Sequence, residues 1–414
     1  MAYVSVPGSK SITNRALLLA ALSDGRCKLN GVLFSDDSRH FLKCLVDLGF
    51  DVSINEEERE VLVRGLGGAI PKSEGSVYVG SAGTAARFIA ALLGISDGVY
   101  TLDSSEQMKK RPMKPLLAAL RSMGTDITYH GEEGFFPFTL DGRGADAREI
   151  AIDIGDSSQF LSALLISSVC FKDGLTIHVK GSHGMSYIEM TVKMMEQFGV
   201  KVLRPDESTF VVEAGQHYHL DSYDIEPDMS AAAYFYAAAA ILKTSTVVRG
   251  VKRVGLQGDV KLFDVLENMG CEVHETAEGV LVKGPEVLRG VDVDMREFSD
   301  QAITVACTAV FATGQTKITG IGHIRHQESD RIHGIATELS RMGIEVLEGD
   351  DYLVITPGCP KSAAIETYDD HRMAMGFSLV GLRAEGIEIL NPMCCRKTFE
   401  NYFEVLDKFI DDLR

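Results

Sequence analysis

The sequence has no tryptophan, few prolines and no long apolar stretch. Its 414 residues include 11 prolines, and the longest strictly apolar run covers only residues 231–242. A run of that length is too short to span a bilayer. The opening residues, MAYVSVPGSK, also lack the charged and apolar regions of a secretory signal. We therefore expect a protein that is neither membrane-spanning nor secreted.

Cysteine pairs with the C-x-x-C spacing of zinc and redox motifs are also missing. The eight cysteines are scattered along the chain, apart from the neighbours Cys394 and Cys395. No C-x-x-C pair is present, so neither a zinc ribbon nor a redox motif is indicated. Reduced, dispersed thiols of this kind are typical of a cytoplasmic protein, and we expect that location.

Positive charge is scarce relative to negative charge. The chain has 41 Lys and Arg against 59 Asp and Glu, which gives a formal net charge of −18 at pH 7. Such a surface repels nucleic acid and anionic membranes, so neither is an expected partner. Any anion that the protein binds must therefore lie in a local basic pocket. The length itself suggests two to three domains.

Five glycines recur at intervals of 71 to 75 residues. They are Gly49, Gly124, Gly199, Gly270 and Gly343. Each ends a segment with helical periodicity, such as FLKCLVDLG or LFDVLENMG, as a left-handed glycine at a helix C-terminus would. Two short runs that favour strands follow each glycine, and this pattern predicts a hairpin.

Between these segments lie helical patterns that are apolar nearly all round, such as SITNRALLLAAL, SSQFLSALLISS and HRMAMGFSLVGL. Such helices are expected to be buried. The sequence thus predicts an α/β protein of about six similar units, each with a buried helix, a strand, an outer helix and a hairpin. Six units suggest two lobes of three, with the sheets outside. The alternative is an accidental recurrence of glycine-ended helices.

Polar residues gather where the buried helices begin, although simple N-caps would account for any one of them. Lys and Arg are unfavourable there, because the helix dipole prefers anions by about 0.3–1 kcal/mol per site. Free N–H groups and glycine-rich loops suit phosphate. If the helix starts of each lobe converge, they predict an electropositive cleft for small polyanionic substrates. The residues are Lys10, Ser11, Asn14, Arg15, Ser81, Gly83, Thr84, Arg87, Asp156, Ser157, Ser158, Gln159, Glu226, Asp228, Ser230, Ser299, Asp300, Gln301, Asp369, Asp370, His371 and Arg372.

Three further stretches are unusually polar, and a solvated loop is the alternative interpretation of each. They are QMKKRPMKP, IRHQESDR and CCRKTF, at residues 107–115, 324–331 and 394–399. The histidines of QHYH and GHIRH lack acidic or cysteine partners at metal-ligand spacing, so surface histidines are favoured over a metal site. PGSK lacks the rest of a Walker loop, and no G-x-S-x-G elbow is present.

A series of motifs lies in order across nearly the whole chain: PGSKSITNRALLLAAL, SAGTAARF, KKRPMKPL, SSQFLSALL, LQGD, SDQAITVA, ESDRIHGIATELSRMG, DDHRMAMGFSL and KTFENYFEVL. Together these motifs resemble those of the 5-enolpyruvylshikimate-3-phosphate synthase family. The resemblance implies an enolpyruvyl transferase-like fold of two similar lobes, each with three units. It implies one lobe from residues 1–9 and 226–414 and a second from residues 10–225, with the active site in the cleft between them.

The resemblance also implies the reaction. The family transfers the enolpyruvyl group of phosphoenolpyruvate to the 5-hydroxyl of shikimate 3-phosphate and releases phosphate, a step of the shikimate pathway to aromatic amino acids. It implies no metal and no organic cofactor, and we expect a monomer. Positions that match shikimate 3-phosphate ligands are Lys10, Ser11, Arg15, Ser157, Ser158, Gln159, Tyr187, Asp300, His323 and Gln327. Positions that match phosphoenolpyruvate ligands are Lys10, Gly83, Thr84, Arg111, Gln159, Arg331, Arg372 and Lys397.

The chemistry that the resemblance implies needs two proton movements. Asp300 is the candidate base for the 5-hydroxyl. Glu328, with Lys10 and His371, is the candidate source of the proton for the vinyl carbon. Each group contributes roughly 10²–10⁴-fold if it is positioned correctly. Closure of two lobes would exclude water and align the two anionic substrates.

Several positions depart from the family's usual residues, mostly on the shikimate side. Gln327 stands where Lys is common, and His323 and Ser81 stand where Asn is common. The serine that usually comes just before the Tyr187 segment is either replaced by Gly184 or shifted to Ser182 or Ser186. The herbicide glyphosate binds the family's phosphoenolpyruvate site, and a glycine such as Gly83 is typical of sensitive members. We therefore expect inhibition by glyphosate.

Two other functions compete with this interpretation. The sister enzyme that acts on UDP-N-acetylglucosamine carries a cysteine before its RP pair, whereas the loop here is SSEQMKKRP, and the SSQ triplet at residues 157–159 is absent from that enzyme. A non-catalytic anion-binding scaffold would not favour carboxylates such as Asp300 and Glu328 beside its anions.

Overall fold

The computed structural model describes residues 1–182 and 184–413. The chain divides into two compact units, Gly8–Ile225 and a second unit that joins Met1–Pro7 to Glu226–Arg414. They are named here the 8–225 unit and the 226–414 unit. Among the described residues, no helix is long and apolar enough to cross a membrane.

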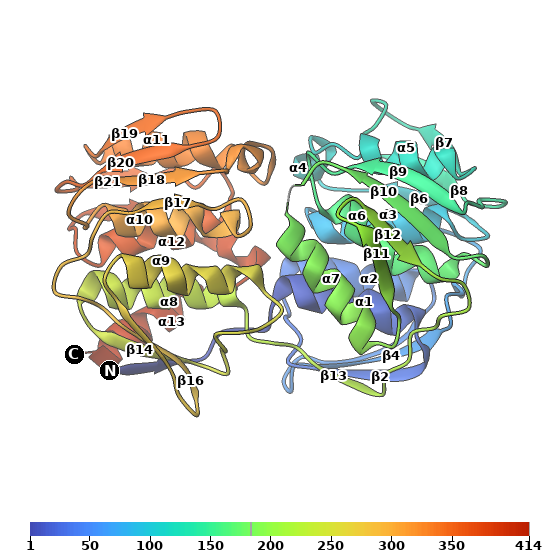
Figure 1. Cartoon of the computed structure of the whole chain (residues 1–414), viewed down its shortest axis with the longest axis horizontal. Coiled ribbons are helices and arrows are strands. Elements are labelled where there is room, and N and C mark those ends of the chain that lie inside the picture. Colours follow the sequence, from blue (N-terminus) through green and yellow to red (C-terminus); the bar gives the residue numbers. More distant parts are fainter. Residues whose placement is uncertain (183, 414) are drawn as a thin grey trace. The chain divides into compact units, whose positions relative to one another are not determined.

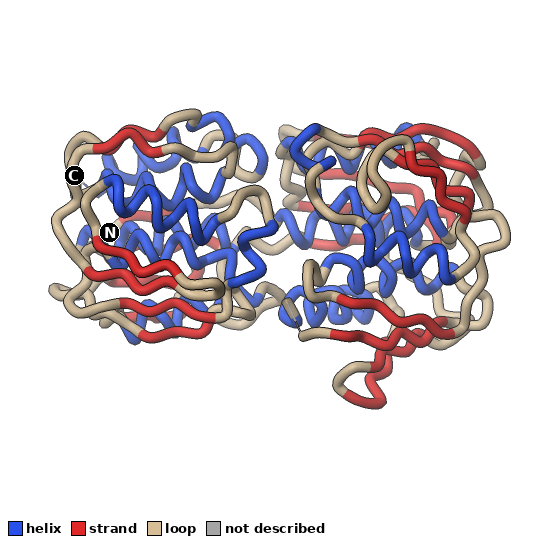
Figure 2. The backbone as a smooth tube through the Cα atoms, turned by 90° about the horizontal axis from the view of Figure 1, so that it is seen from above, coloured by secondary structure: helices blue, strands red, loops and turns tan. Residues whose placement is uncertain are grey.

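The 8–225 unit is built on three buried helices, α1 (Lys10–Leu22), α3 (Gly83–Gly94) and α6 (Gln159–Ser167), which pack against one another. Nearly every side chain of these helices is buried, as their all-round apolar patterns predict. The strands lie around them in Figures 1 and 2. The remaining helices are α2 (Asp36–Asp47), α4 (Glu106–Lys109), α5 (Lys114–Ser122), η1 (Ser168–Cys170) and α7 (Met185–Gln197).

The described strands of the 8–225 unit form three four-stranded sheets, in the orders β13-β2-β4-β3, β5-β6-β8-β7 and β11-β12-β10-β9. In each sheet one parallel pair is extended by an antiparallel hairpin. The strands are β2 (Asp24–Asn30), β3 (Asp51–Asn55), β4 (Glu60–Leu66), β5 (Glu74–Tyr78), β6 (Val99–Asp103), β7 (Asp126–Tyr129), β8 (Phe138–Asp141), β9 (Glu149–Asp153), β10 (Leu175–Lys180), β11 (Val202–Asp206), β12 (Thr209–Val212) and β13 (Ser222–Asp224).

The 226–414 unit has the same plan around the buried helices α8 (Met229–Leu242), α10 (Ala302–Ala309) and α12 (His371–Gly381). Its described sheets have the orders β1-β14-β16-β15, β17-β18-β20-β19 and β21-β22. The strands are β1 (Ala2–Val4), β14 (Ser245–Arg249), β15 (Glu272–Glu275), β16 (Gly279–Lys283), β17 (Asp292–Asp294), β18 (Thr316–Thr319), β19 (Glu345–Glu348), β20 (Leu353–Thr356), β21 (Ala363–Ile365) and β22 (Ile387–Ile389). The other helices are η2 (Gly258–Lys261), α9 (Leu262–Asn268), η3 (Ser299–Gln301), η4 (Gly322–His326), α11 (Arg331–Arg341), η5 (Pro392–Lys397) and α13 (Tyr402–Leu413).

Two strands, called the exchanged strands, belong to one unit although the helix that follows each of them belongs to the other unit. β1 directly precedes α1 of the 8–225 unit, yet it pairs in parallel with β14. β13 precedes α8 of the 226–414 unit, yet it pairs in parallel with β2. The short strand before each buried helix is an element that the sequence pattern did not reveal, because three to five half-exposed residues carry little periodicity.

The five recurring glycines end outer helices in the left-handed conformation, as the sequence predicts. Their φ angles lie between +79° and +104°. Other residues rarely adopt this region, because a Cβ atom would crowd the neighbouring carbonyl. A strand follows each glycine directly and turns back into the hairpin of its sheet.

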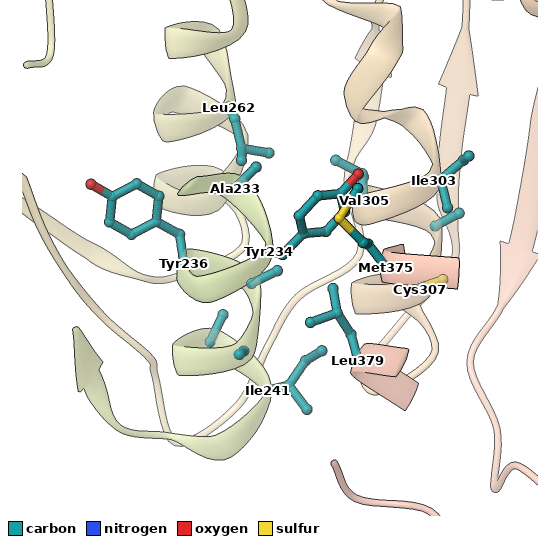
Figure 3. Packing of buried hydrophobic residues seen from close by; sticks show 14 of the residues in the cluster. Ala233, Tyr234, Tyr236, Ile241, Leu262, Ile303, Val305, Cys307, Met375 and Leu379 are labelled. Carbon is teal, nitrogen blue, oxygen red and sulfur yellow. The ribbon is translucent and has the colours of Figure 1, made fainter. Parts of the chain in front are cut away.

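The core of the 226–414 unit lies where α8, α10 and α12 meet. Figure 3 shows Tyr234 of α8 directed toward Val305 of α10 and Met375 of α12. All three side chains are at most 2% exposed. Small residues bring the helices close together, since a Cβ atom on Gly376 of α12 would lie 2.3 Å from Cγ2 of Ile303.

This close approach predicts an unusual effect of Gly376→Ala. Alanine normally stabilises a helix interior relative to glycine by about 0.5–1 kcal/mol. Here we expect overpacking against Ile303 to dominate and to lower the free energy of unfolding by about 1–3 kcal/mol. Urea unfolding measures the change. Gly381→Ala in the same helix is the matched control, because the nearest atom to its added Cβ lies 3.6 Å away. Equal stabilities of the two variants would contradict the prediction.

Candidate functional site

The candidate residues fall into two sets, one in each unit. In the 226–414 unit they are Asp300, His323, Gln327, Glu328, Arg331, His371, Arg372 and Lys397. In the 8–225 unit they are Lys10, Ser11, Arg15, Gly83, Thr84, Arg111, Ser157, Ser158, Gln159 and Tyr187. Each set lies mainly at the N-terminal ends of that unit's buried helices and on the segments beside them. The two sets are called the acidic–basic cluster and the basic cluster.

Arg331 is the centre of the acidic–basic cluster. It begins α11 and is 1% exposed. Its guanidinium donates to both carboxylate oxygens of Asp370 at 2.8 and 3.2 Å, to Asp300 at 3.1 Å and to Glu328 at 2.9 Å. It also donates to Oε1 of Gln327. Burial alone lowers the pKa of Arg331, but the three carboxylates outweigh that effect and raise it.

Asp300 and Glu328 are each held by a second cation. Arg372, near the start of α12, donates from Nη2 to Oδ2 of Asp300 at 2.7 Å. Nζ of Lys397 lies 3.3 Å from Oε1 of Glu328. The side chains of both carboxylates are less than a fifth exposed. Two partly buried carboxylates held in fixed positions by cations are candidates for proton transfer beside anionic substrates.

The two histidines of the acidic–basic cluster have different surroundings. His371 is the first residue of α12 and is 1% exposed, with its Nδ1 3.7 Å from Oδ1 of Asp370. His323, in η4, lies with Nε2 2.7 Å from Oγ of Ser299, the residue before Asp300. The structure therefore brings all eight predicted residues of this unit to one connected region.

Asp370 and Asp259 belong to this region but were not among the predicted ligands. Asp370 is fully buried, caps Arg372 at 3.0 Å and holds Arg331. Asp259 is also buried and accepts a hydrogen bond of 2.8 Å from Gln301. Burial and the nearby charge of Asp300 raise the pKa of Asp259 to about 6. The motifs DDHR and LQGD signalled both residues, but each role depends on a partner distant in sequence.

In the basic cluster, Lys10 begins α1, and its Nζ lies 3.6 Å from Oδ2 of Asp37, a carboxylate that is 3% exposed. Arg15, one turn further along α1, is directed inward. Its guanidinium donates to Oγ1 of Thr191 at 2.7 Å and to the carbonyl oxygen of Tyr187 at 3.2 Å. Burial lowers the pKa of Arg15 to about 10. Arg15 therefore joins α1 to α7 through neutral acceptors.

Two guanidinium groups meet at the start of α3. A Cβ atom on Gly83 would lie 2.6 Å from Nη1 of Arg87 and 2.7 Å from Nη1 of Arg111. Arg87 also donates to the carbonyl oxygen of Gly83 at 3.1 Å and to Oε1 of Gln159 at 3.4 Å. Any larger residue here would therefore displace the guanidinium groups of Arg87 and Arg111. Cations at a helix N-terminus favour an anionic ligand.

The start of α6 completes the basic cluster. Oγ of Ser157 accepts a hydrogen bond from the backbone N–H of Gln159 at 3.2 Å, and Ser158 is 5% exposed. Gly184 approaches it closely, because a Cβ atom there would lie 2.6 Å from Oγ of Ser158. Thr84 follows Gly83 in α3, Ser11 follows Lys10 in α1, and Tyr187 lies in α7. Hydrogen bonds from Arg15 to Ser162 and from Arg87 to Gln159 join the N-terminal halves of α1 and α3 to that of α6.

The two clusters differ in the ligands they suit. Helix N-termini with Lys10, Arg87 and Arg111 favour phosphate and carboxylate groups. The acidic–basic cluster joins cations to carboxylates and suits both anion binding and proton transfer. Among the described residues, no group of three or more His, Cys, Asp or Glu side chains is arranged to hold a metal ion.

Comparisons with known proteins agree on one family. The family described as EPSP synthase (3-phosphoshikimate 1-carboxyvinyltransferase) matches residues 1–406. A 3-phosphoshikimate 1-carboxyvinyltransferase of Nostoc sp. strain PCC 7120 is 43% identical over 411 residues, which cover 99% of this chain and 97% of the relative. The corresponding protein of Photobacterium damsela subsp. piscicida is 43% identical over 409 residues, covering 98% and 96% of the two chains.

Solved structures show the same similarity. An EPSP synthase from Acinetobacter baumannii superposes with a TM-score of 0.82 at 25% identity and covers 98% of this chain and 95% of its own. The enolpyruvyl transferase NikO from Streptomyces tendae shares the fold with a TM-score of 0.76 at 17% identity, covering 99% and 94% of the two chains. The predicted α/β enolpyruvyl transferase-like fold is confirmed.

The raised pKa of Asp259 predicts how stability depends on pH. The folded protein keeps this proton to about pH 6, whereas the unfolded chain releases it near 3.8. Ionisation of Asp259 therefore lowers stability as pH rises through this window, by about 3 kcal/mol in total. Asp259→Asn cannot titrate, so its free energy of unfolding should rise relative to the unaltered protein by about 1–2 kcal/mol between pH 5 and 7.5.

Urea unfolding at several pH values measures this difference. Asp292→Asn, in an exposed position of β17, is the matched control and should leave the difference unchanged with pH. A flat difference for Asp259→Asn would show that the buried carboxyl is ionised throughout the range.

Proposed function

Because the chain belongs to the EPSP synthase family, we propose that it acts as a 3-phosphoshikimate 1-carboxyvinyltransferase. It transfers the enolpyruvyl group of phosphoenolpyruvate to the 5-hydroxyl of shikimate 3-phosphate and releases phosphate. The observation that carries this function is the family match over residues 1–406. The charged clusters of both units support it, since both substrates are anions.

Phosphoenolpyruvate binds mainly through arginine and lysine. Its phosphate and carboxylate are held by Lys10, Arg111, Arg331, Arg372 and Lys397, with backbone and side-chain support from Gly83, Thr84 and Gln159. The fork of arginine pairs with two oxygens of a phosphate or carboxylate at once, and this pairing fixes orientation as well as position. The cations at the start of α3 and α12 are consistent with this role.

Shikimate 3-phosphate is recognised by hydroxyl, amide and charged groups. Ser157 and Ser158 hold its phosphate at the start of α6, where backbone N–H groups are available. Its other ligands are Lys10, Ser11, Arg15, Gln159, Tyr187, Asp300, His323 and Gln327. Gln327 supplies a neutral hydrogen-bonding group where a lysine is common in the family. Both clusters take part in one reaction on the same pair of substrates.

The reaction is an addition followed by an elimination. Asp300 accepts the proton of the 5-hydroxyl as that oxygen attacks carbon 2 of phosphoenolpyruvate. Glu328, assisted by Lys10 and His371, delivers a proton to the vinyl carbon. The resulting adduct then loses a proton from the new methyl group and expels phosphate. Arg331 and Arg372 hold Asp300, and Arg331 and Lys397 hold Glu328, so both carboxyl groups have fixed positions for these transfers.

Three further expectations belong to this proposal. The enzyme acts as a monomer, which light scattering tests. It works in the cytoplasm, and its eight free cysteines are consistent with a reducing compartment.

The herbicide glyphosate acts on enzymes of this family, and it inhibits this enzyme in competition with phosphoenolpyruvate. An inhibition curve that stays flat to millimolar glyphosate would contradict the last expectation.

Phosphate release tests the reaction directly. Release from phosphoenolpyruvate should require shikimate 3-phosphate, and Asp300→Asn should lower kcat by about 10²–10⁴-fold because the 5-hydroxyl loses its base. The exposed Asp292→Asn serves again as control and should retain full activity. Release with UDP-N-acetylglucosamine instead would favour the sister reaction. Retained substrate binding without any turnover in the unaltered protein would favour an anion-binding scaffold.

Gly83→Ala tests the phosphoenolpyruvate site. The added methyl group displaces Nη1 of Arg87 and Arg111, which lie within 2.7 Å of its position. Because a displacement of about 1 Å can cost about a hundredfold, we expect kcat/KM for phosphoenolpyruvate to fall by roughly ten- to a hundredfold. Steady-state kinetics measure this change in kcat/KM. Gly75→Ala, whose added Cβ meets nothing closer than 3.9 Å, is the matched control. Unchanged kinetics in both variants would exclude the start of α3 from substrate binding.

A further inference from the structure

The turn that precedes α12 has an unusual backbone. Tyr368 and Asp369 have φ angles of +54° and +53°, a left-handed region in which a bulky residue such as tyrosine is rare. The backbone N–H of Asp370 donates to the carbonyl oxygen of Thr367 at 2.8 Å and closes the turn. Glycine, asparagine and aspartate are the usual residues at such positions. A conformation of this kind persists only where the surrounding structure holds it, and it is common beside functional sites.

Glu338 of α11 holds one side of this turn, and its side chain is fully buried. Oη of Tyr368 donates to Oε1 of Glu338 at 2.7 Å, and the backbone N–H of Glu366 donates to Oε2 at 3.2 Å. Burial and the neighbouring carboxylate raise the pKa of Tyr368 to about 12, so its hydroxyl remains a donor near neutral pH. The ring also lies against α11, because a Cβ atom on Gly334 would be 3.4 Å from Cε2 of Tyr368. The turn is thus fastened to the helix that begins with Arg331.

The other side of the turn is fastened to η5. Nδ2 of Asn391 donates to Oδ1 of Asp369 at 3.2 Å. Asn391 comes directly before η5, and η5 carries Lys397, whose Nζ lies 3.3 Å from Oε1 of Glu328. Among the described residues, five other than glycine have a positive φ angle, and Asn391, Asp369 and Tyr368 are three of these. The unfavourable backbone angles therefore gather where α11, α12 and η5 are joined.

The turn leads directly into the acidic–basic cluster. Asp370, the next residue, is fully buried and accepts hydrogen bonds from Arg331 at 2.8 and 3.2 Å. His371 and Arg372 follow as the first residues of α12. Nη2 of Arg372 donates to Oδ2 of Asp300 at 2.7 Å. Because Arg372 lies only three residues after Asp369, a rotation of the turn would redirect its guanidinium group.

We propose that Tyr368 and Asp369 are positioning residues for phosphoenolpyruvate, because their hydrogen bonds hold the strained turn that directs Arg372. They act through Arg372 rather than on the substrate itself. The inference rests on the proposed function, in which Arg372 is a phosphoenolpyruvate ligand. The proposed ligands of shikimate 3-phosphate lie mainly in the 8–225 unit, so the effect should fall on one substrate more than on the other.

Tyr368→Phe removes only the hydroxyl group that reaches Glu338. We expect KM for phosphoenolpyruvate to rise by about three- to tenfold, less than the hundredfold that a displacement of about 1 Å can cost. KM for shikimate 3-phosphate should be nearly unchanged. Initial rates with each substrate varied in turn measure both values. A loss of folded protein would lower the apparent kcat and leave both KM values unchanged, so this difference separates positioning from a merely structural role.

Asp369 offers a conservative variant. Asp369→Asn keeps an oxygen for Asn391 and keeps the tolerance of the left-handed region, so its KM values should match those of the unaltered protein. Asp369→Ala loses both features and should raise KM for phosphoenolpyruvate as Tyr368→Phe does. Tyr236→Phe is the matched control, because it removes a hydroxyl that donates to the carbonyl oxygen of Val280 at 3.1 Å in the same unit. It should lower the melting temperature without changing either KM value.

Hydrogen exchange tests the turn independently of activity. The backbone N–H groups of Asp370 and Arg372 are both bonded within this segment, to the carbonyl oxygen of Thr367 and to Oδ1 of Asp370. A peptide that covers residues 366–374 should therefore exchange faster in Tyr368→Phe and Asp369→Ala than in the unaltered protein. Tyr236→Phe should leave the exchange of this peptide unchanged.

The outcomes are distinct. An equal rise of both KM values in Tyr368→Phe, or no rise, would overturn the role in the phosphoenolpyruvate site. Unchanged exchange in both turn variants would overturn the hold on the turn. An effect of Asp369→Asn as large as that of Asp369→Ala would overturn the role assigned to Asp369. If the unaltered protein releases no phosphate with shikimate 3-phosphate, the proposed function fails, whereas hydrogen exchange still decides whether these contacts hold the turn.

Discussion

The 226–414 unit depends on one buried cation, the guanidinium of Arg331. Three carboxylates surround it, and each lies at a different helix start. Asp370 precedes α12, Asp300 precedes α10, and Glu328 precedes α11. Removal of one partner from a buried ion pair leaves an uncompensated charge and costs about 3–5 kcal/mol. The same ionic contacts that hold these helix starts therefore hold the two candidate proton-transfer groups in place.

The 8–225 unit buries an arginine by a different principle. Arg15 is paired with hydroxyl and carbonyl oxygens rather than carboxylates. Its positive charge is therefore not cancelled within its own hydrogen-bonding shell, and burial lowers its pKa. Arg331 has the opposite shift because its charge is balanced by carboxylates. The buried arginine of one unit is thus held by neutral oxygen atoms, whereas the buried arginine of the other is held by carboxylates.

The sequence predicted the family, the fold class and the helix-ending glycines, because these depend on local patterns. Periodicity identified buried helices, and left-handed glycines are local requirements. The sequence did not predict the partners of the buried charges. Arg15 and Thr191 are 176 residues apart, and Thr191 lies in an ordinary amphipathic helix without a recognisable motif. Asp370 was visible only as a helix start, since its contact with Arg331 depends on the packing of α11 and α12.

The exchanged strand β1 has a consequence for synthesis on the ribosome. β1 emerges first, but its partner β14 follows 244 residues later. At about 5–20 residues per second, the delay is on the order of ten to fifty seconds. The whole 8–225 unit is completed in that interval while β1 waits unpaired. Exposed strand edges invite wrong pairing, and the short length of β1, three residues, limits that hazard.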